Sequence, residues 1–172
     1  MSRHGERQLD RRAFLGQSGV GVLGLSAPVL LAARGEYARG GEQRAAVARW
    51  LEAYRRAWVR RDPDAAAALF TPDAVYQEHA FQPAYVGSDA IRGYWATVTA
   101  TQSDIELRYG RPVVARRRAA VEWWANLRNA GAEITLAGEF LLVFARGGLC
   151  KSLREYWFFT EGRLEPPPGW GE

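Results

Sequence analysis

A single carboxylate interrupts the last apolar stretch of the sequence, Leu153–Trp157 (LREYW). Successive side chains of a β-strand point to opposite faces, so in a strand Glu155 shares a face with the apolar residues two positions before and after it. Desolvation raises the pKa of such a carboxyl group, which can then donate or accept a proton at a substrate atom. We therefore name Glu155 as a candidate catalytic residue. The alternative is a structural carboxyl group that bonds to Tyr54, Trp58 or a neighbouring strand.

His79 is the only histidine after the N-terminal segment, which holds His4. Its ring nitrogens can pass a proton or hold a ligand oxygen near neutral pH, which makes it a second candidate catalytic residue. The alternative is a histidine at the end of a strand that bonds to the backbone. One histidine and scattered carboxylates do not have the spacing of metal ligands. We therefore expect neither a metal nor a cofactor.

The elements that must position these residues begin with helices. Between residues 47 and 58, apolar side chains three and four positions apart form one stripe of a helix. Asp62 can cap a second, short helix with Pro63 at its first position, and a third helix begins after Gly87. Between the second and third helices, residues 74–79 (AVYQEH) are predicted to form a short strand.

From residue 103 onward the periodicity is that of strands. Odd-numbered residues from 121 to 127 are all apolar, so we expect this face to point inward. The turns and strands expected after it are a hairpin turn at 129–131, a strand at 134–144, a turn at 146–148 and a strand at 149–159. Helices followed by an antiparallel meander indicate an α+β domain whose sheet wraps the helices.

The N-terminal segment has a different character. Arg11 and Arg12 are followed by a glycine-containing apolar run up to Ala33, and residues 1–35 therefore resemble a twin-arginine secretion signal. Such signals export folded proteins, so we expect the domain in the periplasm or at the cell exterior, with membrane contact only during export. The alternative is an uncleaved signal that anchors the protein in the membrane.

The rest of the chain suits one domain. We divide it into a linker at 36–45, a domain at 46–165 and a proline-rich tail at 166–172; 172 residues that are 48% hydrophobic are enough for one core. The net charge is +4, but residues 1–35 hold most of the excess, so a nucleic-acid surface is not expected. Cys150 is the only cysteine and is expected to be a small buried strand residue.

Three stretches of the chain are typical of a known superfamily: WLEAYRRAWVRRDPDAAAALFTPDAVY, PAYVGSDAIRGYW and LREYW. With them, the sequence from about Ala46 to Trp170 resembles the nuclear transport factor 2-like superfamily, and in particular its SnoaL-like branch. It implies a cone-shaped, cystatin-like α+β fold, with three N-terminal helices packed in a curved antiparallel sheet around a blind apolar pocket. Members of this superfamily include ketosteroid isomerases, limonene epoxide hydrolases, scytalone dehydratase and polyketide cyclases, so the fold alone does not choose an activity.

The resemblance to limonene epoxide hydrolase implies a register for the site. Glu155 takes the inward position of an aspartate on the last strand, and Gln77 and His79 take those of two water-positioning residues on the first strand. Where the hydrolase has an arginine and an aspartate, this chain has Trp123 and Ala125. Without these charged partners, hydrolysis of an epoxide by that mechanism is not expected.

Aromatic residues are candidates for the pocket wall. The candidate substrate-binding residues are Gln77, Tyr54, Trp58, Trp95 and Trp123. The alternative for the aromatic residues is a plain core, which we favour for Trp95. Tyr54 and Trp58 lie on the first helix, which lines the cavity in the family that the sequence resembles.

We therefore expect an exported pocket protein that binds a small apolar molecule and performs acid/base chemistry as an isomerase, dehydratase or hydrolase. Glu155 would move the proton, and His79 and Gln77 would orient the substrate or a water molecule. The alternatives are a non-catalytic binding protein for a hydrophobic ligand and a dimerisation module. Trp124 lies on the outer face of the sheet, and we expect a second copy to cover it in a homodimer.

Overall fold

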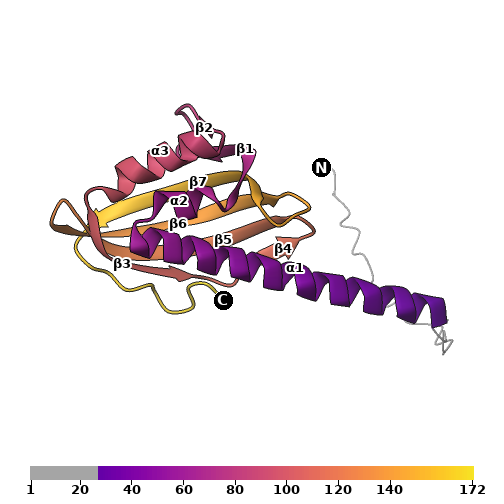
Figure 1. The fold of residues 1–172 in the computed structure, drawn as a ribbon. Helices are drawn as coiled ribbons and strands as arrows, with labels where there is room; N and C mark the ends of the chain where they lie inside the picture. The colour runs from indigo at the N-terminus through magenta and orange to yellow at the C-terminus, as the bar shows by residue number, and fades with distance from the viewer. Residues whose placement is uncertain (1–26) are drawn as a thin grey trace, which may run out of the picture.

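The structure, a computed structural model, describes residues 27–172, with side chains from residue 40. The arginine pair of the expected secretion signal lies outside the described residues. Helix α1 (Ala27–Arg60) runs along the domain and extends beyond it (Figure 1). Residues 36–45, which we expected to form a linker, are part of this helix. Within residues 27–172, no helix combines the length and the apolar character that a membrane span requires.

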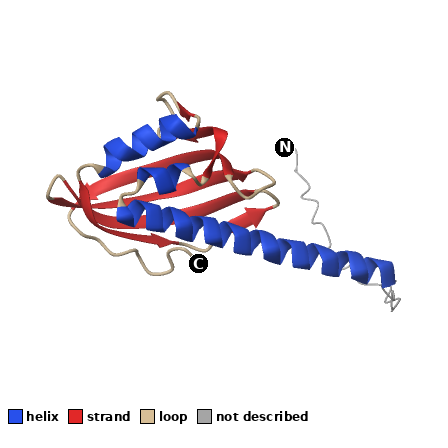
Figure 2. Ribbon diagram, in the orientation of Figure 1, coloured by secondary structure: helices blue, strands red, loops and turns tan. Residues whose placement is uncertain are grey.

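Two shorter helices follow, as the sequence predicts. In α2 (Pro63–Ala67), the side chain of Asp62 caps the first turn by accepting a hydrogen bond of 2.9 Å from the amide of Ala65. Helix α3 (Ser88–Thr99) buries a stripe that includes Ile91 and Trp95. All three helices lie on the same side of the sheet (Figure 2).

The strands form one seven-stranded sheet. Their bounds are β1 (Phe70–Gln77), β2 (Tyr85–Val86), β3 (Gln102–Tyr109), β4 (Val113–Ala115), β5 (Arg118–Asn129), β6 (Ala132–Phe144) and β7 (Cys150–Glu161). The order is β2-β1-β7-β6-β5-β3, and β4 pairs with β5. Strands β1 and β7 are parallel, whereas the other pairs are antiparallel, so the expected antiparallel sheet is in fact mixed. Apolar alternation reveals the faces of a strand, but it carries no information on its neighbour or direction.

Strand β5 carries the inward face that the sequence predicts. Val121, Trp123, Ala125 and Leu127 are all buried and belong to the core between the sheet and the helices. Strands β5 and β6 join through a tight turn in which Ala130 and Gly131 have φ angles of 49° and 86°. Positive φ at both central residues is typical of the turn that matches strand twist in a two-residue hairpin, so the expected hairpin is confirmed.

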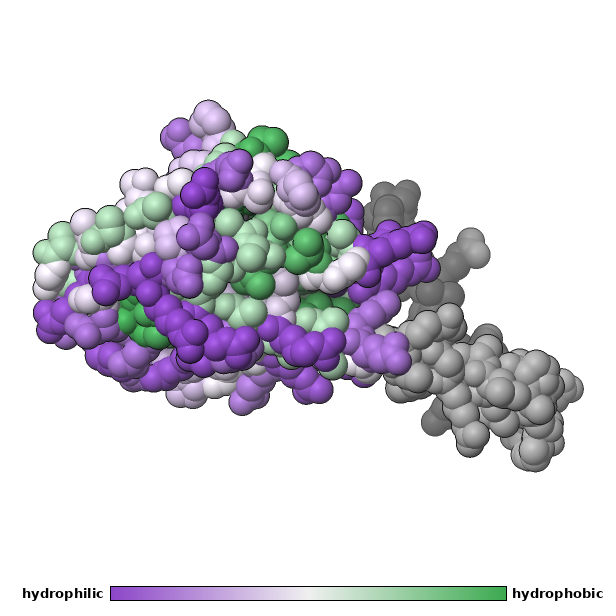
Figure 3. Space-filling view, in the orientation of Figure 1, coloured by the Kyte–Doolittle hydropathy of each residue, from purple (hydrophilic) through white to green (hydrophobic). Residues whose placement is uncertain are grey.

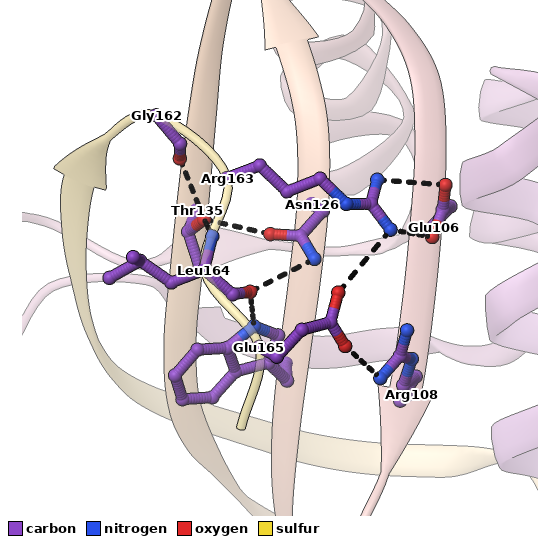
Figure 4. Close-up of polar contacts among 9 residues, drawn as sticks. Glu106, Arg108, Asn126, Thr135, Gly162, Arg163, Leu164 and Glu165 are labelled. Atoms are coloured by element: carbon purple, nitrogen blue, oxygen red, sulfur yellow. Dashed lines mark hydrogen bonds and ion pairs between the residues drawn. The ribbon is translucent and has the colours of Figure 1, made fainter. Parts of the chain in front are cut away.

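The C-terminal segment after β7 returns across the outer face of the sheet. Arg163 forms a bidentate ion pair with Glu106, and Arg108 forms an ion pair with Glu165 through a single hydrogen bond (Figure 4). The backbone carbonyl of Leu164 accepts a hydrogen bond from Asn126. The three prolines of the tail prevent it from forming a strand but leave side chains and carbonyl groups free to bind the sheet.

This segment covers Trp124, which we expected a partner subunit to cover. The indole nitrogen of Trp124 donates a hydrogen bond of 3.0 Å to the carbonyl of Leu164, and the ring of Trp170 packs edge-on against it. Within the described residues, the same chain therefore supplies part of the cover that an exposed indole requires, and Trp124 is half-buried by it. The second copy expected on the outer sheet face stays a prediction.

Candidate functional site

A cavity of about 400 Å³ lies between the helices and the concave face of the sheet. Figure 3 shows this side of the molecule, where hydrophobic residues gather between α1 and α3 and hydrophilic residues surround them. The volume is within the usual range for small-molecule sites. The lining includes Tyr54 and Trp58 of α1, Tyr94 and Trp95 of α3, Trp123 of β5, and Glu155 and Trp157 of β7.

Glu155 is on the face of β7 that points into the cavity, as its position between Leu153 and Trp157 predicts. Its relative exposure is 6%, and its partner across the β6–β7 ladder is the fully buried Phe140. The hydroxyl of Tyr76 donates a hydrogen bond of 2.5 Å to Oε1 of Glu155. The same hydroxyl lies 3.0 Å from that of Tyr54, so a hydrogen-bonded chain connects α1, β1 and β7.

Burial raises the pKa of Glu155 from its ordinary value of 4.5 to about 8. The hydrogen bond from Tyr76 lowers this pKa, and the nearby Glu78 raises it further. At neutral pH the group is therefore mostly a carboxylic acid. Because Oε1 accepts from Tyr76, the proton resides on the other oxygen and can be donated to a bound molecule.

His79 and Gln77 do not line this cavity. The amide nitrogen of Gln77 donates hydrogen bonds to the backbone carbonyls of His79 and Gln82, so it holds the loop after β1 together. The His79 side chain is 48% exposed, and its ring packs against that of Trp157 with 5.1 Å between the centroids. The expectation that both residues face the cavity beside Glu155 is wrong.

The error is a shift of one residue in the register of β1. Ala74 and Tyr76 are buried, and Tyr76 and Glu78 line the cavity, so the even-numbered residues of this segment point inward. A slip of one position moves every side chain of a strand to the other face. The alternation of AVYQEH is compatible with either face, and the alignment to the hydrolase selected the outward one.

The site residues that the sequence analysis missed are Tyr76, Glu78 and Tyr94. Burial, Glu155 and Glu78 together hold the pKa of Tyr94 well above its usual value of 10. Tyr76 and Glu78 were missed with the face of β1, because the alternation of residues 74–79 does not decide which face is buried. Tyr94 lies on α3, and no local pattern in the sequence connects it to Glu155.

The predicted aromatic residues come together around the cavity. Trp58 lies against Trp95 and Trp123, with 5.6 and 5.8 Å between ring centroids. The indole nitrogen of Trp58 donates a hydrogen bond of 2.7 Å to Gln102. These rings are buried in the core, and they also line the cavity. They are therefore both pocket wall and core, which the sequence analysis treated as alternatives.

The sequence matches the model of the SnoaL-like domain over residues 44–152. The chain belongs to this family. No protein of curated function matches the sequence. Among solved structures, the SnoaL-like domain resembles a hypothetical protein of ketosteroid isomerase-like fold from Catenulispora acidiphila DSM 44928, in complex with trimethylamine. The identity is 24%, the match covers 62% of this chain and 83% of that one, and the TM-score is 0.56.

Enzymes are also among the similar structures. One is the epoxide hydrolase/cyclase-like enzyme SalBIII, which acts in pyran ring formation in the polyether salinomycin, with 17% identity over 72% of this chain and 98% of that one and a TM-score of 0.59. Another is an LEH-like epoxide hydrolase from M. tuberculosis, with 17% identity, coverage of 64% and 80% and a TM-score of 0.55. At these identities the likeness shows the nuclear transport factor 2-like, cystatin-like fold alone.

Proposed function

We propose that this SnoaL-like protein binds a small, largely apolar molecule in the Glu155 cavity and catalyses a proton-transfer reaction on it. The observation that carries this proposal is a buried carboxylic acid at the cavity, with a pKa of about 8 and a bond from Tyr76. In a dehydration or an isomerisation, the proton of Glu155 passes to a substrate oxygen or carbon, and the carboxylate then takes a proton from a neighbouring carbon.

The known structures support a small-molecule role without choosing the reaction. SalBIII and the M. tuberculosis protein are described as epoxide hydrolase-like enzymes, and the Catenulispora protein was crystallised with trimethylamine. The absence of the hydrolase's charged pair, whose places Trp123 and Ala125 take, favours the alternative of a non-catalytic binding protein. Both functions use the same cavity.

The variant Glu155→Gln separates these functions. It keeps the acceptor for Tyr76 but cannot release or take a proton, so a catalyst should lose turnover by at least 100-fold while its circular dichroism stays unchanged. The substrate panel would come from molecules identified by native mass spectrometry of the purified protein. A bound molecule that no preparation converts would favour the binding protein, and an unfolded variant would make Glu155 a structural residue.

We also propose export by the twin-arginine route, on the basis of Arg11, Arg12 and the apolar run that follows them. Replacing both arginines by lysine keeps the charge and should retain the protein in the cytoplasm. Cell fractionation measures this directly. Export that survives the double replacement would contradict the proposal.

A second copy of the chain is the partner that we propose for the outer face of β7. Tyr156 is 48% exposed and Phe158 is 82% exposed on this face, next to the region that the tail covers. Replacing Phe158 by Lys should dissociate a homodimer in sedimentation velocity. Phe81→Lys is the matched control, because Phe81 is 99% exposed in the loop between β1 and β2.

A further inference from the structure

The chemical make-up of the cavity selects for charge as well as shape. Aromatic side chains are the commonest type in its lining, and its ionisable groups other than tyrosines are Glu78 and Glu155. Among the described residues that line the cavity, none is lysine, arginine or histidine. The faces of aromatic rings carry partial negative charge and attract cations, whereas they do not stabilise anions.

The rings are arranged as walls rather than as a stack. Trp58 meets Trp95 and Trp123 at interplanar angles of 72°, with centroids 5.6 and 5.8 Å away. Tyr94 meets Trp95 at 76° with 5.9 Å between centroids. These rings pack edge to face against one another, and they reach the cavity from α1, α3 and β5, so aromatic surface that can attract a cation borders it from three elements.

The carboxyl groups have no cationic partner of their own in this site. Glu78 follows β1, and Glu155 lies on the adjacent strand β7. The nearby Glu78 raises the pKa of Glu155. Within the part of the chain that the structure describes, neither group pairs with a lysine or arginine; Glu78 has only the half-exposed His79, 3.7 Å from its Oε1. A partly buried carboxylate at an aromatic wall is therefore open to a positively charged ligand.

We propose that the cavity takes a compact organic cation, an amine or quaternary ammonium compound with an apolar body, with Glu78 as its counter-ion. The alkyl groups lie against the rings of Trp58, Trp95 and Trp123. This inference rests on the proposed function in one respect, namely that the Glu155 cavity is the ligand site. It adds the charge of the ligand.

Binding of such a cation also releases a proton. The titratable groups that face Glu155 are Tyr54 of α1, Tyr76 and Glu78 at β1, Tyr94 of α3 and Tyr109 of β3. None of these groups supplies a positive charge, so a bound cation is the first one beside Glu155 and lowers its pKa. Because Glu155 is mostly protonated at pH 7, the cation displaces a proton, and its affinity rises as the pH approaches 8.

The test uses a pair of probes that differ only in charge. Choline and 3,3-dimethyl-1-butanol have the same shape, with nitrogen replaced by carbon, and isothermal titration calorimetry of the full chain measures both. We expect choline to bind at least tenfold more tightly. Glu78→Gln should remove this preference, whereas Glu139→Gln, at an exposed position on β6, should leave it unchanged. Equal affinities for the two probes, or a preference that survives Glu78→Gln, would overturn the proposal.

Two further measurements separate this inference from the proposed function. Titration of choline in buffers of different ionisation enthalpy should reveal proton release at pH 7 in the wild type and none in Glu155→Gln. The neutral probe 2-naphthol reports whether the cavity binds small molecules at all. If 2-naphthol binds and choline does not, the inference fails and the proposed function stands; if neither binds, both fail.

Discussion

The hydroxyl of Tyr76 donates a hydrogen bond of 2.5 Å to Oε1 of Glu155, and it thereby joins two parallel strands through their side chains at the floor of the cavity. Tyr76 in turn lies 3.0 Å from the hydroxyl of Tyr54 on α1. The protonation of Glu155 is therefore coupled to the packing of a helix against the sheet.

Replacing Tyr76 by Phe should raise the pKa of Glu155 above its value of about 8. The hydrogen bond from Tyr76 lowers this pKa, and burial, which raises it, remains when the hydroxyl is gone. The Tyr54 hydroxyl also loses its partner, so the variant should be less stable by about 1–3 kcal/mol. Carbon-13 NMR titration of the Glu155 carboxyl group measures the first effect.

Tyr156→Phe is the control for this variant, because Tyr156 lies on the outer face of the same strand and is 48% exposed. It should leave the pKa of Glu155 unchanged. A pKa that falls or stays constant in Tyr76→Phe would show that the hydrogen bond does not favour the charged form.

The position of Glu155 was predictable because its neighbours two positions away on either side decide it. In a strand the period is two, so the apolar residues at 153 and 157 place the carboxyl group on the buried face without any further information. The same holds for β5, where four alternate apolar residues predict the inward face correctly. The orientation of Gln77 and His79 was not predictable in this way, because both faces of residues 74–79 carry an apolar residue and a polar one.

Long-range pairing was also beyond the sequence. The parallel contact of β1 with β7 brings Tyr76 to Glu155 across 79 positions of the chain, and no local pattern encodes it. The cover of Trp124 by the C-terminal segment is of the same kind, because it depends on where a strand-breaking tail docks. Helix α1 continues through residues 36–45, where the sequence analysis expects a linker.

The stability of the protein should fall as the pH rises from about 4.5 to about 8. Glu155 has an ordinary pKa of 4.5 when the chain is unfolded and a pKa of about 8 when it is folded, so between these values the folded state holds a proton that the unfolded state has lost. The stabilisation of the folded state by this proton is complete below pH 4.5, and it is lost as the pH rises past 8. The contribution to the free energy of unfolding has a slope of at most about 1.4 kcal/mol per pH unit.

Urea denaturation at pH 5, 6.5, 8 and 9 measures this dependence, with Glu155→Gln as the reference that lacks the titrating group. The difference in unfolding free energy between wild type and variant should shrink with rising pH and then change sign or level off. Parallel curves for the two proteins would contradict the raised pKa. Glu139→Gln should follow the wild type, because Glu139 is exposed.

Gly138→Ala should destabilise the protein and disturb the cavity wall. Gly138 pairs with Trp123 on one side and Trp157 on the other, and an added Cβ would lie 2.9 Å from the Trp123 ring and 2.5 Å from the Tyr156 carbonyl oxygen. Overpacking of this kind costs about 1–3 kcal/mol. Urea denaturation measures the loss, and a change in tryptophan fluorescence reports the displaced ring.

The matched control is Gly93→Ala in α3, where an added Cβ meets nothing within 4 Å. Alanine is the better helix former by about 0.5–1 kcal/mol, so this change should stabilise the protein. The two substitutions are chemically identical and should have opposite signs. Equal effects would mean that the space beside Trp123 does not decide the outcome.

Removal of residues 163–172 should expose the outer face of β5 and lower the free energy of unfolding by about 2–4 kcal/mol. Asn126 and Thr135 are almost fully buried and lose Leu164 as a hydrogen-bond partner, while Trp124 loses its cover.

The control is Arg108→Gln, which breaks only the exposed ion pair to Glu165 and should cost at most about 1 kcal/mol. Sedimentation velocity should show that the truncated chain self-associates more strongly than the full chain, since the bared indole adds apolar surface to a sheet face. A truncated chain with unchanged stability and unchanged association would show that the tail merely rests on the sheet.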